Sequence, residues 1–145
     1  MADEIQSIKN LINSYAELLD TGDFDALGQL FERAIVRVHG SGHEAQGTEA
    51  VRQLLVGNVR LYNGIPSTKH TITNLTVELA ANQQQATARS YYAALQACDG
   101  LPLQLIIAGR WHDRLEWDGE RWFFAERVIY PDLMGDLRFH IQGLV

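Results

Sequence analysis

The sequence contains a single cysteine, Cys98, so no disulfide can form within the chain. One unpaired thiol agrees with a reducing compartment. The sequence also lacks any apolar run of roughly 18 residues, the length that crosses a bilayer as a helix. The first ten residues are acidic and have no apolar segment of the secretory kind. We therefore expect a cytoplasmic protein without a membrane anchor.

Clustered positive charge is absent as well. The formal net charge is -6, and the isoelectric point calculated from the sequence is about 5.2. Binding to phosphate backbones or to anionic lipid surfaces depends on a basic stripe, which this sequence does not have. We therefore expect neither nucleic acid nor a membrane as a partner.

Motifs for metals, nucleotides and covalent catalysis are also missing. There is no HExxH, no CxxC, no glycine-rich phosphate loop and no GxSxG elbow. The histidines at 39, 43, 112 and 140 do not have metal-ligand spacing with another histidine or with a carboxylate. We expect no metal and no other cofactor.

The 145 residues fit one domain, 1–145, and are enough to bury one core. Apolar residues at spacings of three and four predict helices, and alternating β-branched and aromatic stretches predict strands. The predicted helices span 5–19, 24–31 and 48–62. The predicted strands span 33–40, 69–80, 86–98, 103–117 and 121–130, and the segment 131–145 is unassigned. Asp118-Gly119 marks a tight hairpin between the last two strands.

Helices in the N-terminal half followed by a meander of strands predict an α+β fold, not a parallel βαβ fold. We expect a cone-shaped α+β barrel in which a curved, mostly antiparallel sheet carries three helices on one face. Large apolar pockets form in the mouths of such cones. The strands have apolar residues on both faces, and no helices remain to cover the second face. A homodimer or homotrimer is therefore expected.

Two residues could supply acid–base chemistry. Asp20 ends the first predicted helix, where the helix dipole disfavours a carboxylate. His70 opens a strand, and a histidine titrates near neutral pH. Strict alternation places His70, Ile72 and Asn74 on one face and the apolar residues of 75–79 on the other. Taken singly, each has an ordinary explanation: a solvated helix end, and a surface or structural histidine.

Arg127 is the third candidate. Alternation places it in a row with the apolar residues Phe123, Ala125 and Ile129. A permanent charge in such a row needs a partner or a polar cavity. Two interpretations stay open, a buried ion pair with a carboxylate such as Asp113 and a cation that binds substrate.

Three stretches together resemble one known family. They are "IKNLINSYAELLDTGDFDALGQLF", the strand start "KHTITNL", and "GRWHDRLEWDGERWFFAERVI". The resemblance is to the SnoaL-like branch of the nuclear-transport-factor-2-like superfamily, which has the cystatin-like fold, and it covers residues 5–132. In dehydratases and a dehydrochlorinase of this branch, an aspartate at the end of the first helix pairs with a histidine at a strand start. The histidine acts as the base, and the aspartate orients it.

The resemblance implies roles for five residues here. Asp20 and His70 fall on the catalytic positions, and Trp111 and Arg127 fall on pocket positions. Tyr15 falls on a position, five residues before the aspartate, that carries a polar side chain in the relatives, and it is a candidate substrate-binding residue. Several relatives have a further histidine or aspartate on the next strand, whereas this sequence offers Ser90, Tyr91 and Tyr92 there. Tyr92 is therefore added as a candidate substrate-binding residue.

The resemblance also implies a function. We expect a cofactor-independent lyase, isomerase or cyclase that acts on a small hydrophobic molecule containing a ring, of the dehydratase or dehydrohalogenase type. The alternative is a non-catalytic domain of the same fold. Such a domain would bind a small ligand or serve as a scaffold, as does the small subunit of ring-hydroxylating dioxygenases.

Overall fold

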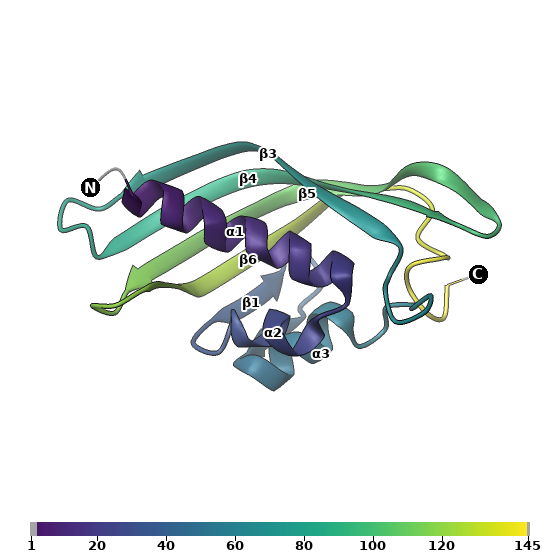
Figure 1. The fold of residues 1–145 in the computed structure, drawn as a ribbon, viewed down its shortest axis with the longest axis horizontal. Coiled ribbons are helices and arrows are strands. Elements are labelled where there is room, and N and C mark those ends of the chain that lie inside the picture. The colour runs from purple at the N-terminus through teal and green to yellow at the C-terminus, as the bar shows by residue number, and fades with distance from the viewer. Residues whose placement is uncertain (1–2, 145) are drawn as a thin grey trace.

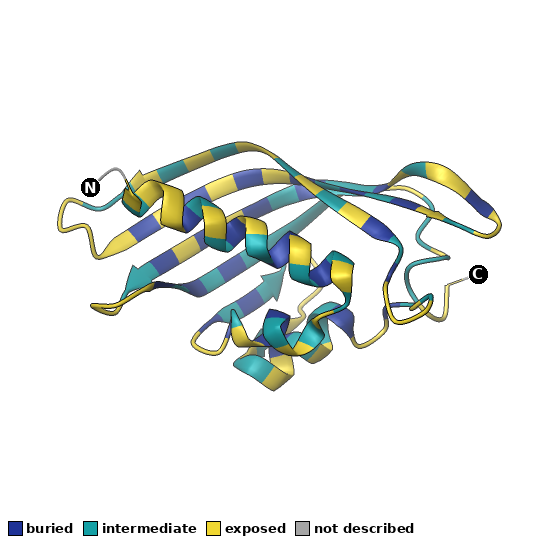
Figure 2. Cartoon of the chain, in the orientation of Figure 1, coloured by how far each residue is buried: buried dark blue, intermediate teal, exposed yellow. Residues whose placement is uncertain are grey.

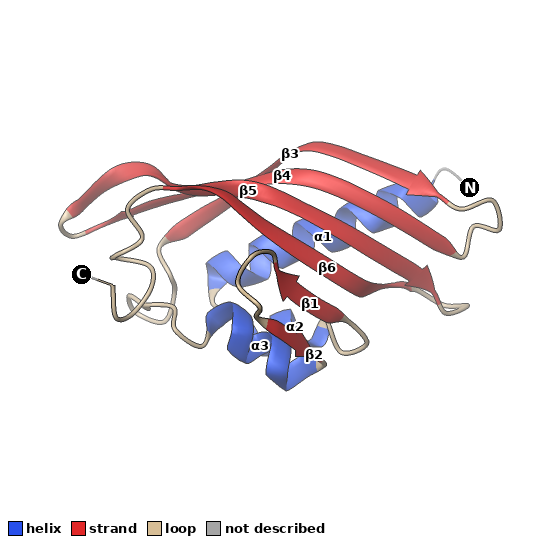
Figure 3. Ribbon diagram, turned by 180° about the vertical axis from the view of Figure 1, so that it is seen from behind, coloured by secondary structure: helices blue, strands red, loops and turns tan. Residues whose placement is uncertain are grey.

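Three helices lie against one face of a six-stranded sheet in the computed structural model, which describes residues 3–144 (Figures 1 and 3). The helices are α1 (Asp3–Thr21), α2 (Phe24–Gln29) and α3 (Thr48–Val56). The strands are β1 (Ile35–Val38), β2 (Glu44–Gln46), β3 (Thr68–Leu79), β4 (Gln85–Cys98), β5 (Leu101–Trp117) and β6 (Trp122–Met134). None of these helices is long and apolar enough to cross a bilayer.

The sheet has the strand order β2-β1-β6-β5-β4-β3. All neighbouring strands are antiparallel except β1 and β6, which run parallel. The predicted α+β fold with a curved, mostly antiparallel sheet is therefore confirmed. Two details differ. The expected loop after the first strand contains the short strand β2, and α3 ends at Val56 because Gly57 caps it and Val59 pairs with Ile141.

Two β-bulges correct the expected pattern of side-chain directions. In β3 the register shifts between Thr73 and Thr76, and Asn74 has a φ of 54°. The extra residue places Leu75 and the apolar residues that follow it on the same inner face as His70 and Ile72. Strict alternation across this strand was therefore wrong, because one unpaired residue reverses the direction of every later side chain.

The second bulge lies in β6. Leu115 pairs with Phe124 and Arg114 pairs with Glu126, so Ala125 is the additional residue. Phe124 and Arg127 consequently face the core together, whereas Phe123 lies on the other side of the sheet, under Arg33. The expectation that Phe123 and Arg127 lie on the same face of the strand was therefore wrong.

Helix α1 crosses the concave face of the sheet and buries an apolar stripe. Its buried residues are Ile8, Ile12, Tyr15, Ala16 and Leu19. The helix ends because Gly22 adopts a left-handed conformation, with a φ of 80°, and the Asp23 amide donates back to the Leu18 carbonyl. A Cβ on Gly22 would lie 2.4 Å from the Gly64 carbonyl oxygen, so only glycine allows this close approach. The turn fixes the last residues of α1 against the segment that leads into β3.

The opposite face of the sheet has no helix over it in the part of the chain that the structure describes (Figure 3). Buried and exposed residues alternate along the first half of β4, as the coloured bands of Figure 2 show. Several large apolar side chains on the strands are exposed, namely Tyr91, Leu103, Leu105, Leu133 and Met134.

Candidate active site

Asp20 and His70 meet where α1 ends and β3 begins. The Asp20 Oδ1 atom lies 2.7 Å from His70 Nδ1, and Asp20 Oδ2 accepts a hydrogen bond of 2.7 Å from the His70 backbone amide. Thr68, on the same strand face as His70, donates its hydroxyl to Asp20 Oδ1 at 2.8 Å. These contacts compensate for the unfavourable position of a carboxylate at a helix C-terminus. We call Asp20 and His70 the dyad.

The dyad is shielded from solvent. The His70 side chain is 7% exposed and the Asp20 side chain 8%. Burial opposes ionisation of Asp20, but the hydrogen bonds and charge of His70, together with the Thr68 hydroxyl, outweigh it and lower the carboxyl pKa. An ionised carboxylate only accepts hydrogen bonds, so His70 Nδ1 is the donor. In the neutral ring, the lone pair is then on Nε2, which is the nitrogen that can take up a proton.

A second group of predicted residues packs around Arg127, which is fully buried. Its guanidinium donates two hydrogen bonds to Asp113, at 2.7 and 2.9 Å. The guanidinium carbon lies 4.0 Å from the ring centre of Trp111 and 4.5 Å from that of Tyr15. Of the two interpretations of Arg127, the ion pair with Asp113 is the one that the structure contains. The Nη1 atom has no hydrogen-bond partner among the described residues.

Tyr92 joins this group by stacking on Trp111, with ring centres 4.8 Å apart and planes at 10°. Trp111 in turn meets Tyr15 edge to face at 4.9 Å. Burial raises the pKa of the Tyr15 hydroxyl; Arg127 opposes that rise, whereas the charges of Asp113 and Asp20 add to it. Burial also raises the pKa of Tyr92. Both hydroxyls are therefore protonated near neutral pH and can donate hydrogen bonds. We call Tyr15, Tyr92, Trp111 and Arg127 the aromatic cluster.

The structure thus sorts the six predicted residues into two sets. Asp20 and His70 touch each other, and the members of the aromatic cluster touch each other. Tyr15 lies on α1, the helix that also carries Asp20. Sequence reasoning missed Thr68. Its place two residues before His70, on the same strand face, was the available signal.

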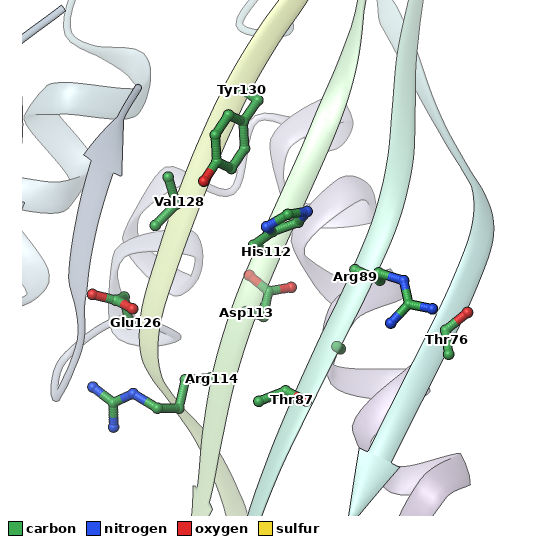
Figure 4. Close-up of a pocket in the computed structure, with 10 residues that line it drawn as sticks. Thr76, Thr87, Arg89, His112, Asp113, Arg114, Glu126, Val128 and Tyr130 are labelled. Carbon is green, nitrogen blue, oxygen red and sulfur yellow. The ribbon is translucent and has the colours of Figure 1, made fainter. Parts of the chain in front are cut away.

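A hollow of about 420 Å³ lies elsewhere, over the sheet face that has no helix (Figure 4). His112 lies at its centre, with Arg89 and Arg114 directed to either side. Neither dyad residue lines this hollow, and no member of the aromatic cluster does. Within residues 3–144, no three His, Cys, Asp or Glu side chains gather closely enough to share a metal ion.

The fold agrees with the comparison to known proteins. The profile of the SnoaL-like domain family matches residues 1–128, and the chain belongs to this family. A search of curated protein sequences gives no match.

Solved structures of the same fold are similar over nearly the whole chain. One is an NTF2-like protein with a cystatin-like fold from Novosphingobium aromaticivorans, with 21% identity, a TM-score of 0.73, and coverage of 90% of this chain and 83% of that one. A protein from the same bacterium, provisionally named a scytalone dehydratase, has 21% identity, a TM-score of 0.74, and coverage of 94% and 91%. The beta subunit of an aromatic-ring-hydroxylating dioxygenase, also provisionally named, has 15% identity, a TM-score of 0.72, and coverage of 94% of both chains.

Proposed function

We propose that the protein is a cofactor-independent lyase, isomerase or cyclase in which His70 removes a proton from a small hydrophobic substrate that contains a ring. One observation carries the proposal: the buried contact of 2.7 Å between His70 Nδ1 and Asp20 Oδ1. A carboxylate in this position fixes the ring tautomer and stabilises the imidazolium that forms. Exclusion of water strengthens the pair, because the local dielectric is low.

The proposed first step breaks a C–H bond next to an electron-withdrawing group such as a carbonyl. The proton moves to His70 Nε2, and the bonding electrons form an enolate. In an elimination, these electrons then form a C=C bond while a hydroxide or halide leaves with the electrons of its own bond. A departing hydroxide takes the proton back from His70 and leaves as water, so neither an oxidant nor a cofactor is consumed.

The aromatic cluster has a supporting role in this proposal. Tyr15, Tyr92 and Trp111 would provide an apolar wall with two hydroxyl donors, and Arg127 would direct its unpaired Nη1 toward developing negative charge. Because Asp113 already neutralises Arg127, the guanidinium would act as an oriented donor more than as a free positive charge. We further propose that the protein acts in the cytoplasm as a homodimer or homotrimer.

Proton abstraction can be tested without knowing the leaving group. The measurement is exchange of the α-protons of a cyclic ketone, such as 2-tetralone, in D2O, followed by NMR. We expect His70→Ala to lower the enzyme-dependent exchange rate by about 10²–10⁴-fold, the usual contribution of a general base. Asp20→Asn keeps the shape of the side chain and should lose most of the enzyme-dependent exchange rate. His43→Gln, in an exposed loop, is the control and should match the wild type.

A second function is a non-catalytic domain that binds a small ligand or serves as a scaffold. It is favoured by the uncovered sheet face and by the similarity to a dioxygenase beta subunit. The exchange measurement separates the two functions. If His70→Ala exchanges the ketone protons as fast as the wild type, the base role is wrong and the scaffold function is the better one.

A further inference from the structure

Residues 135–144, here called the closing segment, run across the end of the cone where the dyad lies (Figure 1). The Arg60 amide donates to the His140 carbonyl and the Gln142 amide to the Asn58 carbonyl, each at 2.8 Å. The Tyr62 hydroxyl donates to the Phe139 carbonyl at 2.5 Å. These bonds hold the closing segment against residues 58–62, next to the start of β3.

The closing segment also reaches the residues behind the dyad. Gln96 of β4 is buried, and its amide donates to the Phe139 carbonyl at 3.1 Å. Gln96 is the cross-strand partner of Thr68, whose hydroxyl is bonded to Asp20. The residue before His140 is therefore connected to the dyad through Gln96 and Thr68.

The ring of His140 is unusual in this setting. Its Nδ1 atom is buried and has no hydrogen-bond partner among the described residues. Burial lowers the pKa of His140 to about 4; the charge of His70 adds to this lowering, and the charge of Asp20 opposes it. Both members of the dyad therefore act electrostatically on this ring. Among the other polar groups at the closing segment are the Tyr62 hydroxyl, the Gln96 amide and Arg60, whose Nε is also buried and has no hydrogen-bond partner among the described residues. The Asp136 carboxylate pairs with Arg138 within the segment itself.

We propose that His140 is the third residue of the active site, a neutral imidazole whose unpartnered nitrogen donates a hydrogen bond to the oxygen that gains charge when His70 takes a proton. The proposal rests on the function proposed above. It divides the work between two histidines whose surroundings differ. His70, paired with a carboxylate, accepts the proton, whereas His140, whose Nδ1 has no hydrogen-bond partner among the described residues, stays uncharged and acts as a donor.

The proton count agrees with this division. The proton that leaves the substrate carbon goes to His70, and His140 neither gains nor loses a proton. A neutral imidazole has one N–H, which stabilises an enolate oxygen without transferring its proton. Arg127 contributes little net charge to the site, because Asp113 pairs with its guanidinium and aromatic rings cover it, so a further neutral donor adds to the stabilisation.

The first test measures the coupling between His140 and the dyad, independently of any substrate. Imidazole nitrogen signals are followed by NMR from pH 7 to pH 4.5 in the wild type and in three variants. In the wild type, His140 should remain mostly neutral across this range. His70→Gln should raise the titration midpoint of His140, Asp20→Asn should lower it further, and the control His43→Gln should leave it unchanged. A wild-type midpoint near 6.5, or one that neither dyad variant moves, would overturn the proposal.

The second test addresses the donor role in the ketone exchange assay. His140→Phe keeps a ring but has no N–H, and it should exchange about 10²-fold more slowly than the wild type. His140→Gln restores a donor and should recover part of the loss. If His140→Phe exchanges as fast as the wild type, the donor role is wrong even though His70 remains the base. If the wild type itself shows no exchange, the proposed function fails, and the titrations still decide whether His140 is coupled to the dyad.

Discussion

Arg127 and Asp113 form an ion pair inside the core. Both side chains are completely buried, and the two residues lie opposite each other on β5 and β6. The aromatic rings of Trp111 and Tyr15 cover the guanidinium. Removing two charges from water is costly, and the bidentate bonds and ring contacts offset that cost only while both partners are present.

Breaking this pair should therefore destabilise the protein strongly. Arg127→Met leaves Asp113 as an uncompensated buried charge, and we expect a loss of about 3–5 kcal/mol in the free energy of unfolding. The measurement is urea denaturation. Arg110→Met is a matched control, because Arg110 makes an equally bidentate pair with Asp132 on the same two strands, but in solvent. That variant should lose at most about 1 kcal/mol. Equal losses in the two variants would show that burial does not set the cost.

At the level of the elements, the helix period and the glycine stop predicted where α1 ends, whereas the family resemblance supplied the expectation that Asp20 comes next to His70. The apolar stripe fixes which side of α1 faces the sheet, and Gly22 fixes where α1 ends. The bulges at Asn74 and Ala125 were not anticipated, because an extra residue only shifts the phase of the alternation, and apolar residues on both nominal faces also fit a regular strand with two apolar faces.

The closing segment was also beyond the sequence pattern. Residues 131–145 show no helical or strand period in the sequence. In the structure β6 continues to Met134, and the position of residues 135–144 depends on tertiary bonds to Gln96 and to residues 58–62. His140 could therefore be recognised as a neighbour of the dyad only after the chain was folded. Its signal in the sequence was no different from that of His43, which lies in an exposed loop.

The free energy of unfolding should decrease as the pH falls, because His140 of the closing segment is buried in its neutral form. The pKa of His140 is about 4 in the folded protein, and an ordinary histidine has 6.5. Above pH 6.5 neither state takes a proton at this position. Between pH 6.5 and about 4 the unfolded chain becomes protonated first, so folding loses up to about 3 kcal/mol as the pH falls.

His140→Gln should remove this slope. The free energy of unfolding, measured by urea denaturation at several values between pH 7 and pH 4.5, should depend less on pH than in the wild type. Asp20, whose pKa is lowered, contributes only below about pH 5, at the acid end of this range, and it contributes equally in the wild type and the variant. His43→Gln should keep the wild-type slope. If His140→Gln keeps the full pH dependence of the free energy of unfolding, groups other than His140 cause the loss of stability in acid.

At the level of the whole molecule, the sheet has one face covered by helices and one without them (Figure 3). The uncovered face holds Tyr91 and Leu133, which are 54% and 69% exposed and together line a second hollow, separate from the one in Figure 4. Exposed apolar groups of this kind commonly mark an interface.

We predict that two or three copies associate through this face. Light scattering at micromolar concentration should give the mass of a dimer or a trimer for the wild type. Leu133→Glu should give the monomer mass, because it places a charge within the apolar part of the face. Ile5→Glu, an exposed apolar residue on α1, is the control and should keep the wild-type mass. A wild type that elutes as a single monomeric species would contradict the prediction.

The position of β6 has a consequence for how the chain can be assembled during synthesis. This last strand lies between β1 and β5. Because Ile35 pairs with Glu126, β1 can join the sheet only after β6 has been made. The Trp122 indole donates to Glu4, 118 residues earlier. Contacts between such distant positions form slowly and only after most of the chain has left the ribosome. Until then α1 exposes its apolar stripe, and a growing chain of this protein would be a natural client for chaperones.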